Sequence, residues 1–203
     1  MRAKHNRLYW LGILVVALLP SVALAEASPA TSADAEKIEA AAEKAYDAED
    51  LDIAMPLFIK AAQMNSLRAQ VYLGEMMEAS QVYEAAVGWY LTAAMQGDPA
   101  AQYALGRMYI SGTGIEKDDA KALYWIKHSA DKKHLPAVKV MANAYRVGLL
   151  GLQVDQDQAA SWEAKAARLE AIQRKETDEK LKAFIADQKK LQEEKAAARK
   201  AEK

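Results

Sequence analysis

The feature that most constrains the fold of this chain is an internal repeat in its middle. A short pattern, Ala69-Gln70-x-x-Leu73-Gly74, recurs 32 residues later and then, more loosely, after a further 36 residues. The later copies are Ala101-Gln102-x-x-Leu105-Gly106 and Ala137-Val138-x-x-Met141-Ala142. Self-similarity at a period of about 30 to 40 residues indicates a solenoid, in which each unit buries its apolar face against the next.

Three tryptophans support the same register. Trp89, Trp125 and Trp162 follow the three copies, at steps of 36 and 37 residues. The small residues of the pattern allow neighbouring helices to approach closely, and stacked helix pairs then share one continuous core. We expect Trp125 to fill the wider gap between helix pairs.

Each unit has the pattern of two helices joined by a turn. In the middle unit, apolar residues recur at helical spacing over residues 104–109. Ser111-Gly112-Thr113-Gly114 follows, and its two glycines permit the positive φ of a tight reversal. Asp118 or Asp119 is placed to cap a second helix. The pattern therefore predicts helix, turn and helix within each unit.

The middle unit also carries a longer motif. It reads Tyr109-x-x-Gly112-x-Gly114-Ile115-x-x-Asp118-x-x-Lys121-Ala122-x-x-Trp125. This motif resembles the Sel1-like repeat, a relative of the tetratricopeptide repeat. The first and third units depart from it in their turns, and residues 33–66 resemble a tetratricopeptide-type helix pair. The resemblance implies an all-α, right-handed α-solenoid of antiparallel helix pairs, with units at about 33–66, 67–98, 99–134 and 135–170.

The first 25 residues have the layout of a secretory signal peptide. Basic residues at positions 2, 4 and 7 precede an apolar run from Leu8 to Leu19, and Ala23-Leu24-Ala25 supplies a small-residue cleavage site. We expect cleavage after Ala25, export to the periplasm and no stable membrane insertion afterwards. The alternative is an uncleaved anchor, for which the apolar run is short. Residues 26–32 then form a leader that we expect to be disordered.

The C-terminal segment is highly charged. From Glu170 to Lys203, 18 of 34 residues are charged. Leu181, Phe184, Gln188 and Leu191 form a short stripe at 3-4-3 spacing, too brief for a long coiled coil. We expect residues 171–203 to be a charged, solvated helix or a disordered tail that is dispensable for the fold, with a dedicated docking helix as the alternative.

Candidate chemistry is scarce. The chain has no cysteine, which excludes disulfides and thiolate metal sites, and its net charge of −1 argues against a nucleic-acid partner. His128 and His134 lie six residues apart, so they do not share a face of one helix. Glu75 and Glu78 could pair as general acid and base, but a solvated helix face is the simpler interpretation. We expect no metal, no cofactor and no catalytic site.

The resemblance implies that the first helix of each pair lines a concave surface. Projecting helical positions onto it selects ten residues: Arg68, Val71, Glu75, Glu78, Tyr103, Arg107, Ile110, Lys139, Asn143 and Arg146. Arg107, Lys139 and Arg146, together with Asn143, could hold a carboxylate or an acidic peptide segment. Ordinary surface charge is the alternative explanation.

These features predict a periplasmic scaffold or adaptor that binds a partner protein or peptide in its concave groove. We expect a monomer whose partner is another envelope protein or an acidic peptide segment. The alternative is a cell-envelope enzyme acting on peptidoglycan or a related polymer, which would require a convergent polar cluster.

Overall fold

The computed structural model describes the backbone of residues 29–201 and the side chains of residues 33–195. The expected signal peptide, residues 1–25, lies outside the described part of the chain. Residues 29–201 contain eight helices and no strand. The predicted all-helical solenoid is thus confirmed. None of the described helices is long and apolar enough to cross a membrane.

The helices form consecutive antiparallel pairs. Their bounds are α2 Pro29–Asp47, α3 Leu51–Gln63, α4 Leu67–Ala79, α5 Tyr83–Met95, α6 Pro99–Ser111, α7 Asp119–Asp131, α8 Leu135–Val147 and α9 Gln156–Ala201. Because α2 begins at Pro29, the expectation of a disordered leader over residues 26–32 is wrong for residues 29–32, which are helical. Proline is well suited to this position, since the first turn of a helix needs no backbone N–H.

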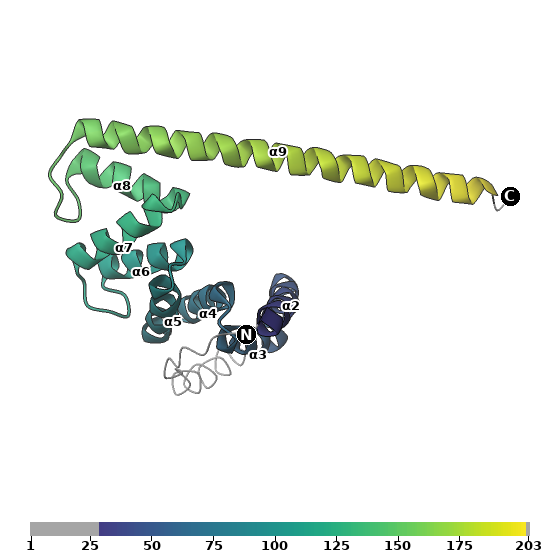
Figure 1. Cartoon of the computed structure of the whole chain (residues 1–203), viewed down its shortest axis with the longest axis horizontal. Coiled ribbons are helices and arrows are strands. Elements are labelled where there is room, and N and C mark those ends of the chain that lie inside the picture. The colour runs from purple at the N-terminus through teal and green to yellow at the C-terminus, as the bar shows by residue number, and fades with distance from the viewer. Residues whose placement is uncertain (1–28, 202–203) are drawn as a thin grey trace, which may run out of the picture.

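Each helix packs against its neighbours along the chain, and the pairs follow an arc (Figure 1). The helix α9 begins against α8 and then continues as a rod beyond the repeats. It has 46 residues, which corresponds to about 69 Å at 1.5 Å per residue. The C-terminal segment is therefore helical through Ala201.

Local signals fix the ends of the helices. The side-chain oxygens of Ser66, Asp98 and Asp118 accept hydrogen bonds from the backbone N–H groups three residues on, at 3.0, 2.7 and 2.9 Å. Of the two caps predicted for the second helix, Asp118 or Asp119, the structure uses Asp118. Gly112 ends α6 with a φ of 72°, and Gly114 has no room for a side chain, because an added Cβ would lie 2.5 Å from the carbonyl carbon of Tyr83.

The glutamine of the repeated pattern caps the C-terminal end of the preceding helix. The side-chain amide of Gln70 donates to the carbonyl of Ala62 at 3.5 Å, and that of Gln102 donates to the carbonyl of Ala94 at 3.1 Å. Both carbonyls belong to the last turn of the helix before, where the i+4 backbone donor is missing and each carbonyl otherwise accepts from the backbone N–H three residues on, at 3.0 Å. In the third unit Val138 is buried at the same position.

Two glycines set the closest approach between paired helices. An added Cβ at Gly74 would lie 2.4 Å from the ring of Tyr90, and one at Gly106 would lie 2.7 Å from the side chain of Ile126. Both facing side chains are fully buried. Ile126 thus fills the close contact within the pair of α6 and α7. Trp125, which we expect to fill the wider gap between pairs, is partly buried and packs against the main core cluster. Adjacent residues of a helix point in different directions, so Ile126 and Trp125 contact different neighbours.

We predict that Gly74→Ala lowers the free energy of unfolding by about 1–3 kcal/mol, because the new methyl group overpacks against the Tyr90 ring. In a Tyr90→Leu background the same exchange should cost less or stabilise, since alanine is the better helix former by about 1 kcal/mol. Urea unfolding of the four proteins measures both costs. Equal costs in the two backgrounds would show that Tyr90 does not set this contact.

Candidate partner-binding surface

The ten residues predicted to line the groove all lie on the first helices of the repeat units. We call them the inner row: Arg68, Val71, Glu75 and Glu78 on α4, Tyr103, Arg107 and Ile110 on α6, and Lys139, Asn143 and Arg146 on α8. Arg68, Glu75, Arg107, Lys139 and Arg146 are exposed, and the other five are partly buried. No residue of the row is fully buried in the core.

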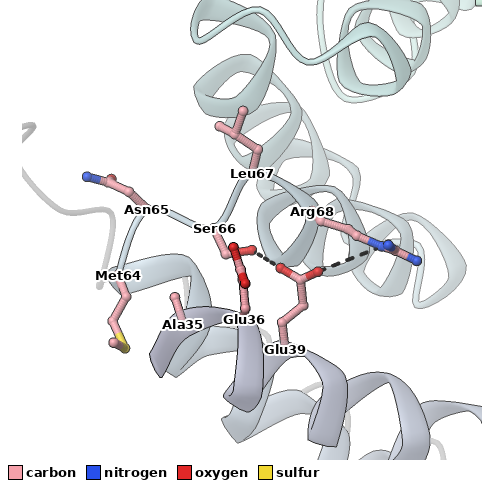
Figure 2. Close-up of a pocket in the computed structure, with 8 residues that line it drawn as sticks. All are labelled: Ala35, Glu36, Glu39, Met64, Asn65, Ser66, Leu67 and Arg68. Atoms are coloured by element: carbon pink, nitrogen blue, oxygen red, sulfur yellow. Dashed lines mark hydrogen bonds and ion pairs between the residues drawn. The ribbon is translucent and has the colours of Figure 1, made fainter. Parts of the chain in front are cut away.

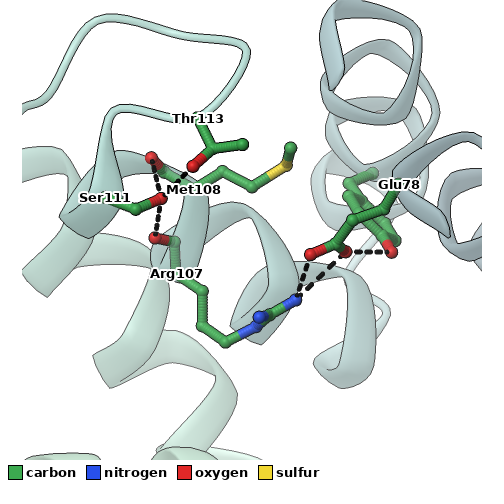
Figure 3. Close-up of polar contacts among 6 residues, drawn as sticks. Glu78, Arg107, Met108, Ser111 and Thr113 are labelled. Carbon is green, nitrogen blue, oxygen red and sulfur yellow. Dashed lines mark hydrogen bonds and ion pairs between the residues drawn. The ribbon is translucent and has the colours of Figure 1, made fainter. Parts of the chain in front are cut away.

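The centre of the inner row is a polar cluster that joins α4, α5 and α6 (Figure 3). The Glu78 carboxylate accepts two hydrogen bonds from Nη2 of Arg107, at 2.9 and 3.1 Å. It also accepts one from the Tyr90 hydroxyl at 3.0 Å. Burial, and then the charge of Glu78, raises the pKa of Tyr90 well above its ordinary value. Its hydroxyl therefore stays protonated and remains a donor to Glu78.

Aromatic contacts extend this cluster to α8. The Arg107 guanidinium lies 5.8 Å from the centroid of the Tyr103 ring, and the Tyr103 ring lies 5.3 Å from that of His134. His134 is the residue directly before α8. Burial lowers the pKa of His134, which favours its neutral form beside the tyrosine. Three consecutive repeats are thus linked along one surface.

Arg68 lies at the N-terminal end of the row. Its Nε is 2.6 Å from Glu43 and 3.8 Å from Glu39, both on α2. Glu39 also accepts a hydrogen bond from Ser66, the cap of α4. An open hollow of about 340 Å³ lies here, lined by Ala35, Glu36, Glu39 and residues 64–68 (Figure 2). Charged groups of both signs line it, and they already contact one another.

At the other end, the cations of α8 are paired with α9. Lys139 lies 2.6 Å from Glu170, and this contact lowers the pKa of Glu170. Arg146 lies 3.2 Å from Glu163 and donates to the side-chain oxygen of Asn143 at 2.8 Å. The predicted basic residues of the row thus have carboxylate partners within the chain. An acidic ligand stays a prediction, and at α8 it would compete with Glu163 and Glu170.

Sequence reasoning missed these internal partners. The carboxylates of Glu39, Glu43, Glu163 and Glu170 lie on helices beside the row rather than on it. No motif marks them, because an ion pair between two helices depends on which faces meet. The acidic residues of α2 and of early α9 were the available signal, but the sequence did not assign them to this surface.

The other residues considered as candidate sites, in the 111–114 turn and at the two histidines, occupy structural positions. Ser111 Oγ donates to the backbone carbonyls of Arg107 and Met108 and lies 2.7 Å from the Thr113 hydroxyl, as expected of a helix-ending turn (Figure 3). His128 is exposed on α7, and His134 lies in the turn before α8. Within the described residues, no group of three or more histidine, aspartate or glutamate side chains could hold a metal ion.

Glu75 and Glu78 differ in environment although they lie one turn apart. Partial desolvation by neighbouring side chains, and then the charge of Glu78, raises the pKa of Glu75, although the residue is exposed to solvent. Glu78 is instead held by Arg107 and Tyr90. The two carboxylates therefore have different roles: Glu78 supports the packing of three helices, whereas Glu75 is the exposed acid of the row.

We predict that Glu78→Ala lowers the free energy of unfolding by about 1–3 kcal/mol, because it leaves the buried Tyr90 hydroxyl without its acceptor. The matched control is Glu75→Ala, one turn away and exposed, which should change stability by at most about 0.5 kcal/mol. Thermal or urea unfolding at neutral pH compares them. Equal losses would contradict a structural role specific to Glu78.

Comparison with known proteins places the repeats in a family. The Sel1 repeat matches residues 67–98, 99–134 and 140–170. A Sel1 repeat protein from Oxalobacter formigenes has a similar crystal structure, with a TM-score of 0.52 and 27% identity over 56% of this chain and 88% of that one. The crystal structure of c5321, a protective antigen of uropathogenic Escherichia coli strains with an SLR fold, gives a TM-score of 0.62 and 32% identity over 66% of this chain and 30% of that one.

One curated relative is the uncharacterized protein NMB1327 of Neisseria meningitidis serogroup B. It is 30% identical over 107 residues, which are 53% of this chain and 22% of the relative. The chain therefore spans about a fifth of that relative's length. The Sel1 fold is generally a non-catalytic scaffold that mediates protein–protein interactions. Three repeats of this chain match the Sel1 repeat, and the similar solved structures have the same fold. This chain is therefore a Sel1 repeat protein.

Proposed function

We propose that this Sel1 repeat protein is a periplasmic scaffold or adaptor that binds a segment of a partner protein along its inner row. The observation that carries the proposal is that ten side chains from three consecutive units lie on the first helices, where none is fully buried. Stacked helix pairs present extended surfaces of this kind to partners. The periplasmic location rests on the sequence of residues 1–25.

The part of the inner row at the junction of α4 and α6 offers both apolar and charged side chains to a partner. Val71, Tyr103 and Ile110 are partly buried and offer apolar surface, while Glu75 and Arg107 are exposed beside them. Such a mixture of aromatic, aliphatic and arginine side chains is typical of contact surfaces. A peptide segment lying here would contact two units at once.

Arg107 retains the capacity to bind an acidic group of the partner. The guanidinium has five N–H donors, and its bonds to Glu78 use Nη2. The Arg107 side chain is 45% exposed, so its other nitrogens are reachable. A partner carboxylate can therefore bind to Arg107 without displacing Glu78, whereas Arg146 already uses both terminal nitrogens for Glu163 and Asn143.

We predict that a photo-crosslinking amino acid placed at Tyr103 gives a covalent adduct with one partner in living cells. The matched control is Tyr124 on α7, which is exposed but lies on a second helix. The adduct from position 103 should be lost when Arg107 is changed to Glu, with unchanged helical content by circular dichroism. Adducts formed only from position 124 would move the binding surface away from the inner row.

The proposed location has its own test. We predict that the protein isolated from cells begins at Glu26, after removal of residues 1–25 by a signal peptidase. Intact-mass measurement of a periplasmic extract determines the first residue. Recovery of the unprocessed chain in the inner-membrane fraction would contradict export in this form and would leave the crosslinking result unaffected.

A further inference from the structure

The C-terminal two thirds of α9 leave the repeats and lie exposed. Every described side chain from Ala171 to Lys195 is exposed, and Figure 1 shows this part of the helix running out from the last pair. We call residues 171–201 the arm. At 1.5 Å per residue, the arm is about 46 Å long. Its apolar side chains therefore have no cover from the body of the protein.

Three of the five large apolar side chains of the arm form a stripe, and Ile172 and Ile185 are exposed outside it. Leu181, Phe184 and Leu191 recur with Gln188 at 3-4-3 spacing, so they share one face of the helix. Their exposed fractions are 55%, 60% and 42%. This is the spacing by which one helix packs along another, with a polar residue at one core position. A second helix laid along this face would cover all three apolar residues.

We propose that this second helix is the arm of another copy of the chain, lying antiparallel to the first. In this arrangement Leu181 of each copy faces Phe184 of the other, and a twofold axis passes between residues 182 and 183. The pairing is self-complementary, as an interface between identical copies must be. It goes beyond the proposed function, because it leaves the inner row of each copy untouched, and it replaces our expectation of a monomer.

Charges along the stripe favour the antiparallel direction. Continuing the 3-4 spacing in both directions reaches Arg174 before the apolar residues and Lys195 after them. Parallel arms would place each of these cations directly opposite its own copy, which is unfavourable. Antiparallel arms separate the like charges and place Arg174 opposite Leu191 of the other copy, where its aliphatic stem can cover the leucine.

A second pair of charges points to a second copy as the occupant. Lys180 and Asp187 are seven residues apart, so they lie on the same edge of the stripe. Neither forms an ion pair within the described residues, although other charges of the arm do, such as Lys182 with Glu179. In the antiparallel register, Lys180 of each copy lies within about one helical turn of Asp187 of the other. Each chain thus supplies the cation of one intermolecular ion pair and the carboxylate of the other.

The test is the oligomeric state of the chain as cells process it, measured by sedimentation velocity over a range of concentrations. We expect a reversible monomer–dimer equilibrium, weakened at least ten-fold by Leu181→Ser with Phe184→Ser. Lys180→Asp alone and Asp187→Lys alone should each weaken the dimer, and the two together should restore it. Lys182→Asp, the same charge change on the far side of the helix, is the matched control and should have no effect on association.

The relative direction of the two arms is measured in a separate experiment. The chain has no cysteine, so Glu193→Cys carries a single spin label on the side of the arm away from the stripe. Antiparallel arms place the two labels roughly 32 Å apart along the axis, and parallel arms place them roughly 10–20 Å apart. A monomer at every concentration, a dimer indifferent to the stripe and charge variants, or the short label distance would each overturn the proposal.

Discussion

The close approach of paired helices at Gly74 and Gly106 is the contact on which the rest of the structure depends. At both positions a large buried side chain of the second helix occupies the space that a Cβ would need. A thirteen-residue helix is marginal alone, so each helix of the array owes its stability to such packing. Because this close contact recurs with the repeat, it also brings the first helices of the units into a common orientation. Their residues outside the core then form the inner row.

The sequence predicted the fold because the signals that define it are local. The turn at residues 111–114, the cap at Asp118 and the repeated Ala-Gln pattern each act within a few residues of their own positions. The residue that meets Gly106, Ile126, was not assigned to this contact from the sequence, although the neighbouring Trp125 stood out. A motif marks the most recognisable residue of a repeat, whereas the contact within a pair depends on which side of the helix faces its partner.

The inner row shows the limit of such reasoning. Helical projection correctly placed its ten residues on α4, α6 and α8, but the ion pairs of Arg68, Arg107, Lys139 and Arg146 required knowledge of which helices meet. Two of these pairs connect α8 with the start of α9. The cations predicted to hold a ligand therefore also hold the last helix against the repeats. Beyond Glu170 that attachment ends, and the remaining helix is free of the body.

The central claim of this account is that stability resides in the packed pairs from α2 to the first turns of α9, and that the arm adds nothing to it. The most direct test is the unfolding of a chain truncated after Glu170. It is measured at a concentration low enough that copies do not associate. The account predicts a single cooperative transition, with a free energy of unfolding within about 0.5 kcal/mol of the full chain. A large loss of stability, or a transition that becomes gradual, would contradict it and would show that the arm packs back onto the repeats.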